Sequence, residues 1–133
     1  MPQRAFKVGP LDKESDMAMT KLDFSNPDEW KTPNPLTKVY TIWGDPEGKK
    51  KFHKFCLAPG WQWKQHVQPY VGGMSCQRHH SGYITAGSMA FKMDDGSETV
   101  VKAGQSYDIP PGHDAWNAGD DEIVCIEFDQ APL

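Results

Sequence analysis

The chain has 133 residues, a length that fits one domain with a single hydrophobic core. With 38 % hydrophobic residues, 24 % charged residues and a net charge of −4, its composition is that of a soluble globular protein. It lacks the basic stripe typical of nucleic-acid-binding proteins, and no apolar run is long enough to span a bilayer. The first residues also lack the apolar block of a signal peptide, so we expect a cytoplasmic protein.

Residues 1–36 are polar and rich in proline. We expect this part to form an extended arm that lies on the rest of the protein or on a partner chain. Residues 26–29 have the order of a helix start, with Asn26 as a possible N-cap and Pro27 in the first turn. One or two helical turns at most are therefore expected in the arm.

Residues 37–133 have a different pattern, in which short runs of alternating residues are separated by turns rich in Gly, Pro and Asp. Runs of this length and spacing are typical of a β-sandwich or β-barrel. The strands expected from the pattern are 39–43, 51–57, 61–67, 81–93, 99–102, 106–109, 115–117 and 122–128.

The three cysteines are far apart in the sequence and odd in number, which does not indicate a disulfide framework. Cys56 and Cys125 lie in strand-like runs, and we expect them to be small core residues. Cys76 differs because two histidines, His79 and His80, follow it closely.

Two glycine turns carry a resemblance to a known family. Gly104, followed after five residues by Pro110-Pro111-Gly112, resembles the second motif of the cupins. Residues 83–91, which turn at Gly87 and return towards Asp94-Asp95-Gly96, resemble the end of the first cupin motif. The resemblance covers about residues 50–130 and is strongest to small single-domain cupins that carry Pro-Pro-Gly-His-Asp-Ala-Trp, here residues 110–116. It implies an all-β cupin fold, a double-stranded β-helix or jelly-roll barrel, over residues 37–133, and it implies a homodimer.

Typical cupins bind a metal through a His-x-His pair, a Glu on the next strand and a His after the Pro-x-Gly corner. Carried onto this sequence, the pair becomes His66 and Gln68, the Glu becomes His80, and the last His becomes Ala115. His113 stands two residues earlier and can still point inward, because alternate residues of a strand share a face.

The resemblance therefore implies His66 and His80 as metal ligands, with His113 as a further candidate. Cys76 joins this set because its spacing from His79 and His80 brings a thiolate within reach of the same ion. Imidazoles suit Zn, Fe, Ni or Cu, and a cysteine thiolate favours Zn. The alternative is a metal-free barrel in which these histidines only form hydrogen bonds.

Other residues are candidates for contact with a ligand or for acid–base catalysis. His80, His113 and Asp114 are candidate general acids or bases, although Asp114 can equally bond the backbone of its corner. Arg78 suits an anionic ligand if it points inward, and is otherwise an exposed arginine. The remaining candidates for ligand contact or for the walls of a cavity are Gln68, Trp43, Tyr83, Tyr107 and Trp116.

We expect the remaining histidines and two tryptophans to have structural roles. His79 should point away from the barrel, and His53 should be a packed histidine. Trp61 shares a strand face with Trp63, opposite to His66, so we expect both tryptophans to pack outside the barrel.

Three functions are compatible with this sequence. The first is an enzyme, of the lyase, isomerase or metal-dependent oxygenase type, that acts on a small organic substrate in the barrel mouth. The second is a metal-free cupin that binds or senses a small ligand without chemistry. The third is an interaction role for the arm. We favour the enzyme because several ionisable groups converge on one end of the barrel.

Overall fold

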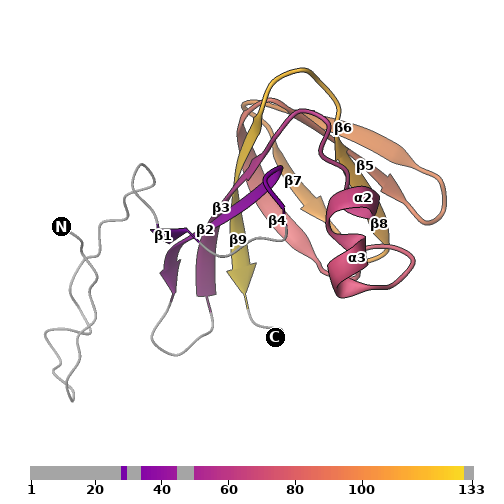
Figure 1. Ribbon diagram of the computed structural model, residues 1–133, viewed down its shortest axis with the longest axis horizontal. Helices are drawn as coiled ribbons and strands as arrows, with labels where there is room; N and C mark the ends of the chain where they lie inside the picture. The colour runs from indigo at the N-terminus through magenta and orange to yellow at the C-terminus, as the bar shows by residue number, and fades with distance from the viewer. Residues whose placement is uncertain (1–27, 30–33, 45–49, 131–133) are drawn as a thin grey trace, which may run out of the picture.

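The computed structural model describes residues 28–29, 34–44 and 50–130, and within them the protein is built almost entirely of β-strands (Figure 1). The elements are β1 (Asp28–Glu29), β2 (Thr37–Gly44), β3 (Lys50–Leu57), α2 (Trp63–His66), α3 (Gln68–Val71), β4 (His80–Ala86), β5 (Ser88–Met93), β6 (Glu98–Lys102), β7 (Ser106–Ile109), β8 (His113–Asn117) and β9 (Ile123–Gln130).

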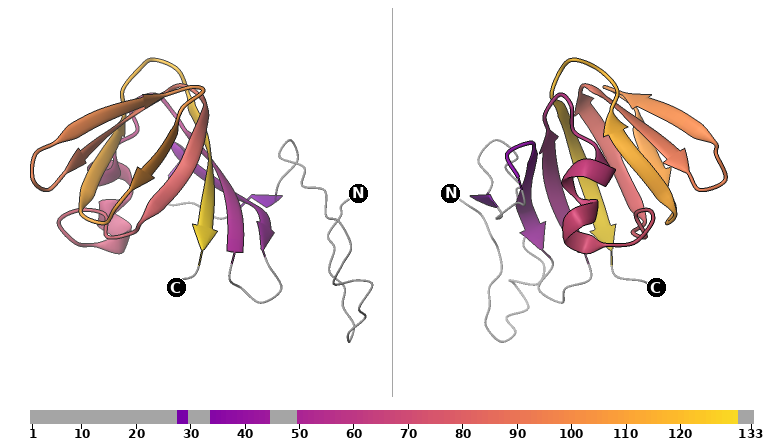
Figure 2. Two further views of the ribbon diagram at one scale, coloured as in Figure 1. Left: turned by 180° about the vertical axis from the view of Figure 1, so that it is seen from behind. Right: turned by 45° about the vertical axis from the view of Figure 1, so that its right-hand side comes forward.

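The strands form two antiparallel sheets. The larger sheet has the order β1-β2-β3-β9-β4-β7, and the smaller has the order β6-β5-β8. From β4 onward the chain passes repeatedly between the sheets: β4 belongs to the larger, β5 and β6 to the smaller, β7 to the larger, β8 to the smaller and β9 to the larger. Figure 2 shows the two sheets curling around one interior, with both helices on one side. This is the all-β double-stranded architecture expected from the sequence.

The passage from β4 to β5 depends on Gly87. Its φ of +83° lies in the left-handed region. A Cβ on this residue would also lie 2.7 Å from the carbonyl oxygen of Glu122, so a side chain has no room. The glycine turn thus lets one continuous stretch of sequence supply a strand to each sheet.

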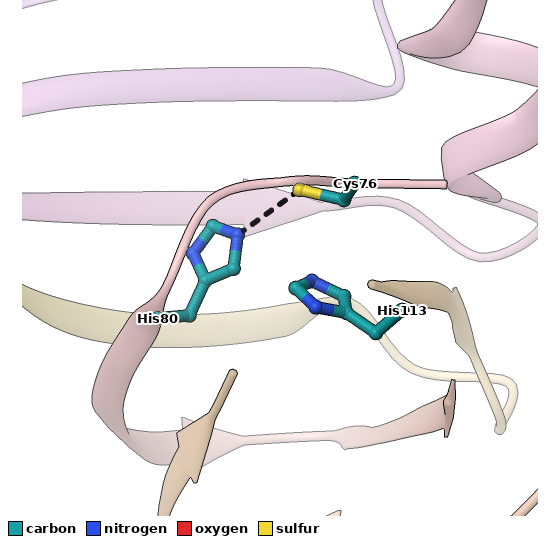
Figure 3. A group of neighbouring side chains, drawn as sticks. All are labelled: Cys76, His80 and His113. Carbon is teal, nitrogen blue, oxygen red and sulfur yellow. Dashed lines mark hydrogen bonds between the residues drawn. The ribbon is translucent and has the colours of Figure 1, made fainter. Parts of the chain in front are cut away.

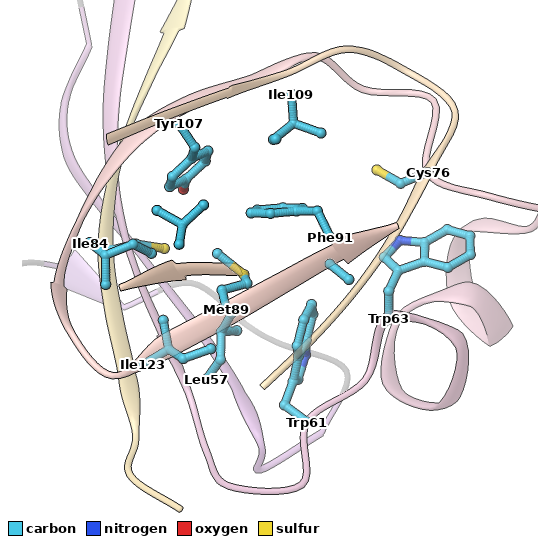
Figure 4. Close-up of a cluster of buried hydrophobic side chains, with 13 residues drawn as sticks. Leu57, Trp61, Trp63, Cys76, Ile84, Met89, Phe91, Tyr107, Ile109 and Ile123 are labelled. Carbon is cyan, nitrogen blue, oxygen red and sulfur yellow. The ribbon is translucent and has the colours of Figure 1, made fainter. Parts of the chain in front are cut away.

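The hydrophobic core fills the space between the sheets (Figure 4). Side chains alternate along the strands: in β4, Gly82 and Ile84 are buried while Tyr83 and Thr85 are exposed. Ile84 and Ile123, from neighbouring strands of the larger sheet, are both 0 % exposed. The buried residues of a strand therefore show which of its two faces points into the core.

The segment after β3 differs from the expectation. The predicted strand over residues 61–67 is wrong, because the chain pairs with β8 only at Gln62 and then coils into α2 and α3. Pro69 supports this course, because proline is tolerated in the first turn of a helix. The expectation that Trp61 and Trp63 lie outside the barrel is also wrong, because both are buried in the core.

Several smaller expectations have clear outcomes. All three cysteines are free, Cys125 is buried and Cys56 is half-buried. His53 is buried, as expected of a packed histidine. Asp28–Glu29 pairs with β2 rather than forming a helical turn, while most of the predicted arm lies outside the described residues. No helix in the described part of the chain is long and apolar enough to cross a membrane.

Candidate metal centre

Three side chains from separate parts of the chain converge at one end of the barrel (Figure 3). Cys76 lies in the loop before β4, His80 begins β4 in the larger sheet, and His113 begins β8 in the smaller sheet. The ligand atoms of these residues, the sulfur and one nitrogen from each ring, all lie within 4.8 Å of one another. Within residues 28–29, 34–44 and 50–130, this is the one such group of three His, Cys, Asp or Glu side chains.

Backbone pairing brings Cys76 to His113. The two residues form an isolated antiparallel bridge, in which the Cys76 amide donates to the His113 carbonyl at 2.8 Å. The Gly112 amide donates to the Cys76 carbonyl at 2.7 Å. Gly112 has a φ of +92°, which turns the chain sharply from Pro110-Pro111 into β8. The corner predicted from the sequence therefore places a histidine beside the cysteine.

His80 is held by two residues of the larger sheet. Its Nδ1 donates to Oε1 of Glu127 at 2.8 Å, because an ionised carboxylate can only accept. The hydroxyl of Tyr107 donates to the other oxygen of the same carboxylate at 2.6 Å. This arrangement turns Nε2 of His80 towards Cys76, whose sulfur is 3.5 Å away.

His113 is held by the backbone instead. Its Nδ1 donates to the carbonyl oxygen of Pro110 at 2.7 Å, so the Nε2 atom is left for the centre. The ring packs edge-to-face against Phe91, with centroids 5.9 Å apart, and only 2 % of the residue is exposed. The aromatic contact and the carbonyl together leave His113 little freedom to rotate.

The charges of Cys76 and His80 depend on each other. Burial raises the pKa of the Cys76 thiol, but its hydrogen bonds with His113 and His80 outweigh burial and lower the pKa to about 6. Burial lowers the pKa of His80, but hydrogen bonds with Cys76 and Glu127 raise it to about 10. Each residue therefore favours the charged form of the other, the Cys76 thiolate and the His80 imidazolium.

The other residues predicted for the site lie elsewhere. His66, at the end of α2, accepts a hydrogen bond at Nδ1 from the Gln62 amide at 3.0 Å and is not part of the cluster. The amide nitrogen of Gln68 donates to the Gly73 carbonyl at 2.6 Å. Asp114 is half-buried and lies 3.8 Å from the ammonium group of Lys64.

The aromatic and charged candidates also differ in placement. Tyr83 points away from the core and is 40 % exposed, while Arg78 is exposed. Trp116 is half-buried, and the side chain of Trp43 lies outside the described part of the structure. His79 is exposed as expected, and its Nε2 lies 2.7 Å from a carboxylate oxygen of Asp108.

Sequence reasoning missed Glu127. Its signal was present, because Glu127 has the same parity in β9 as the buried residues Ile123 and Cys125. A carboxylate at an inward position of an apolar strand needs a partner. That partner, His80, is 47 residues away in the sequence, so only the pairing of β4 with β9 reveals the contact.

Comparison with known proteins shows the fold. No family model matches the chain, and no curated protein matches it. Among solved structures, it is similar to the Cupin_2 domain of an XRE family transcriptional regulator from Enterobacter cloacae, at 14 % identity and a TM-score of 0.55 over 74 % of this chain and 99 % of that one. It is similar to an RmlC-like cupin with a double-stranded β-helix fold from Methanocaldococcus jannaschii, at 15 % identity and 0.55 over 87 % and 93 %.

A third similar structure is the polyketide cyclase RemF from Streptomyces resistomycificus, at 15 % identity and a TM-score of 0.59 over 86 % of this chain and 83 % of that one. The neighbours thus include an enzyme and a domain of a transcriptional regulator. At such low identities the likeness establishes the cupin double-stranded β-helix as the fold, and function must be argued from the site.

Proposed function

We propose that this chain is a metal-dependent cupin enzyme that acts on a small organic molecule, with the metal held by Cys76, His80 and His113. One observation carries the proposal: a sulfur and two imidazole nitrogens meet within 4.8 Å of one another. In each imidazole the other nitrogen, Nδ1, is already engaged by an acceptor, Glu127 or the Pro110 carbonyl. Metal-ligating histidines in proteins are typically oriented by such partners.

The donor set suits zinc. A thiolate and two neutral imidazoles are the ligands that Zn²⁺ prefers, and a catalytic zinc site has three protein ligands and one open position. The lowered pKa of Cys76 favours the form that binds metal. On binding, the proton on Nε2 of His80 would be released while Glu127 keeps the proton on Nδ1 in place.

A bound zinc ion would act as a Lewis acid on a substrate oxygen or on water, without redox chemistry. We therefore favour an isomerase or lyase over an oxygenase. The role of the chain is to hold the ligands and to exclude water on the core side. Cys76 belongs to the same buried cluster as Trp63, Phe91 and Ile109, which gives the centre an apolar floor (Figure 4).

Metal analysis of the purified protein tests this proposal. We expect about one zinc per chain in the wild-type protein, and loss of the metal in Cys76→Ala and His113→Ala. His66→Ala should retain the metal, because His66 is a ligand only in the set predicted from the cupin motif and lies outside the cluster in the structure. Metal-free wild-type protein after reconstitution with zinc, or full zinc occupancy in His113→Ala, contradicts the assignment.

The second candidate function is a metal-free cupin that binds or senses a small ligand. It is favoured by the hydrogen bond between Cys76 and His80, which satisfies the centre without an ion, and by the likeness to a regulator's cupin domain. A small molecule that co-purifies with metal-free protein, detected by mass spectrometry, would favour this function over the enzyme.

We also propose that the protein acts in the cytoplasm as a homodimer and binds neither nucleic acid nor membrane. The free cysteines suit a reducing compartment, and the net charge of −4 disfavours nucleic acid. Light scattering coupled to size-exclusion chromatography tests the dimer, which a mass of one chain would rule out.

A further inference from the structure

The carboxylate of Glu127 has both of its oxygens engaged. One accepts from Nδ1 of His80 at 2.8 Å, and the other accepts from the Tyr107 hydroxyl at 2.6 Å. The Glu127 side chain is only 12 % exposed, so two protein hydrogen bonds replace most of the hydration of this carboxylate. A buried carboxylate with two fixed donors has one orientation, and that orientation determines how the His80 ring is presented.

The Tyr107 hydroxyl is itself held by the shape of its surroundings. Tyr107 is 7 % exposed, and its ring packs against Phe91 with centroids 5.3 Å apart. The hydroxyl also lies close to Gly82, where a Cβ would come within 2.6 Å of the hydroxyl oxygen. The absence of a side chain at residue 82 therefore makes the room in which the hydroxyl sits.

The two histidines of the centre are oriented in different ways. His113 is oriented by a main-chain carbonyl, that of Pro110, whereas His80 depends on two side chains, Glu127 and Tyr107. The Tyr107 hydroxyl donates to Glu127, so its hydrogen bond acts on His80 through the carboxylate.

From this geometry we propose that Tyr107 and Glu127 are positioning residues for the metal centre: together they fix the rotation of His80 and the proton on its Nδ1, and so set metal affinity. The inference rests on the proposed function, because it requires that His80 is a ligand. Removing an acceptor behind a metal-bound histidine typically weakens metal binding about 10–100-fold. Glu127→Gln keeps one acceptor oxygen for His80 but loses the charge and the second acceptor for Tyr107, so we expect a loss of about tenfold. We expect a loss of about the same size for Tyr107→Phe, which leaves the carboxylate in place but free to turn.

The experiment measures zinc dissociation constants by competition with a chromophoric chelator. The variants are Tyr107→Phe and Glu127→Gln, each with a matched control that makes the same chemical change at the surface. Tyr70→Phe removes a hydroxyl from a residue that is 64 % exposed. Glu98→Gln neutralises an exposed carboxylate whose oxygen lies 4.0 Å from the ammonium group of Lys92.

Two further measurements separate positioning from a merely structural role. The first is the rise in melting temperature caused by zinc, which should shrink in the two site variants, whereas a structural defect lowers the metal-free and zinc-loaded melting temperatures alike. The second is the visible spectrum of the Co²⁺-substituted protein. The sulfur-to-cobalt band from Cys76 should persist in Tyr107→Phe while the d–d bands of the metal shift.

The outcomes distinguish this inference from the function on which it rests. Wild-type protein that binds no zinc overturns the metal centre and the positioning roles together. Wild-type protein that binds zinc, with both site variants within twofold of it, overturns the positioning roles alone. If Tyr107→Phe does not fold, the zinc dissociation constant of the nearly isosteric Glu127→Gln tests the positioning role by itself.

Discussion

His80 and His113 come from different sheets, yet their rings meet edge-to-face with centroids 5.1 Å apart. Each histidine is the first residue of its strand, and the sulfur of Cys76 lies beside both rings (Figure 3). The centre therefore bridges the two layers of the barrel where the chain crosses at Pro110-Pro111-Gly112. Its geometry depends on how the sheets pack and on the loop that carries Cys76.

In the metal-free protein, Cys76 should be the first of the three thiols to react with iodoacetamide at pH 7. Its hydrogen bonds with His113 and His80 outweigh burial and lower its pKa to about 6, whereas burial raises the pKa of Cys56 and of Cys125. The thiolate is the reactive form, so Cys76 should be labelled before the more exposed Cys56.

Peptide mapping by mass spectrometry gives the order of labelling. Zinc should protect Cys76 and leave the labelling of Cys56 unchanged. Labelling in the order of exposure, with Cys56 first, would show that the histidines do not activate the thiol.

Gly82→Ala should destabilise the protein by about 1–3 kcal/mol, the usual cost of overpacking a core. The new Cβ would lie 2.6 Å from both the Tyr107 hydroxyl and the Ile126 carbonyl oxygen. Gly119→Ala is the matched control, since no atom lies within 4 Å of a Cβ there, and it should change stability by less than about 0.5 kcal/mol. Urea denaturation measures both, and equal stability of the two variants would contradict the close approach at Gly82.

Thr37→Val should cost about 1–3 kcal/mol, because it leaves a buried donor without its acceptor. Nε1 of Trp61 donates to the Thr37 hydroxyl at 2.9 Å, and both residues are buried. Thr37→Ser keeps the hydroxyl and should be the milder change. Free energies of unfolding give the order, and a milder effect of Val than of Ser would show that this hydrogen bond contributes little.

The protein should lose stability as the pH rises above about 9. Burial raises the pKa of Tyr107 and of Cys125 above their usual ranges, so both stay protonated in the folded state. The unfolded chain loses these protons near its ordinary values, about 8.5 for Cys and about 10 for Tyr. The stabilising contribution is therefore complete below those values and is lost at about 1.4 kcal/mol per pH unit for each group above them.

Unfolding free energies between pH 7 and pH 10.5 test this slope. Tyr107→Phe should be less sensitive to pH above pH 10 than the wild-type protein, even if it is less stable at pH 7. An unchanged slope in that variant would contradict the raised pKa of Tyr107.

Much of the fold could be predicted because turns and alternation are local signals. The glycine turn at Gly87 and the corner at Pro110-Pro111-Gly112 both lie where the sequence placed them. The alternation of Trp61 and Trp63 predicts a strand, but the chain is paired with β8 only at Gln62 and turns into α2 from Trp63 onward. Contacts with distant residues fix its course: Nε1 of Trp61 donates to the Thr37 hydroxyl, 24 residues earlier, and the Asn117 amide donates to the Trp61 carbonyl.

The site was harder to predict than the fold. Cys76 and His80 are close in sequence, and their spacing could suggest a shared centre. The cupin motif carried onto the sequence predicts His66 as a ligand, but in the structure this residue ends α2 and lies outside the cluster. Glu127 depends on the register between β4 and β9, which the sequence alone does not specify.

The different supports of the two histidines have an evolutionary consequence. Every amino acid carries a main-chain carbonyl, so a substitution at Pro110 does not by itself remove the acceptor that orients His113. One nucleotide change can, by contrast, remove the carboxylate behind His80. A substitution in β9 can therefore remove the support of His80, whereas the support of His113 does not depend on the side chain at residue 110.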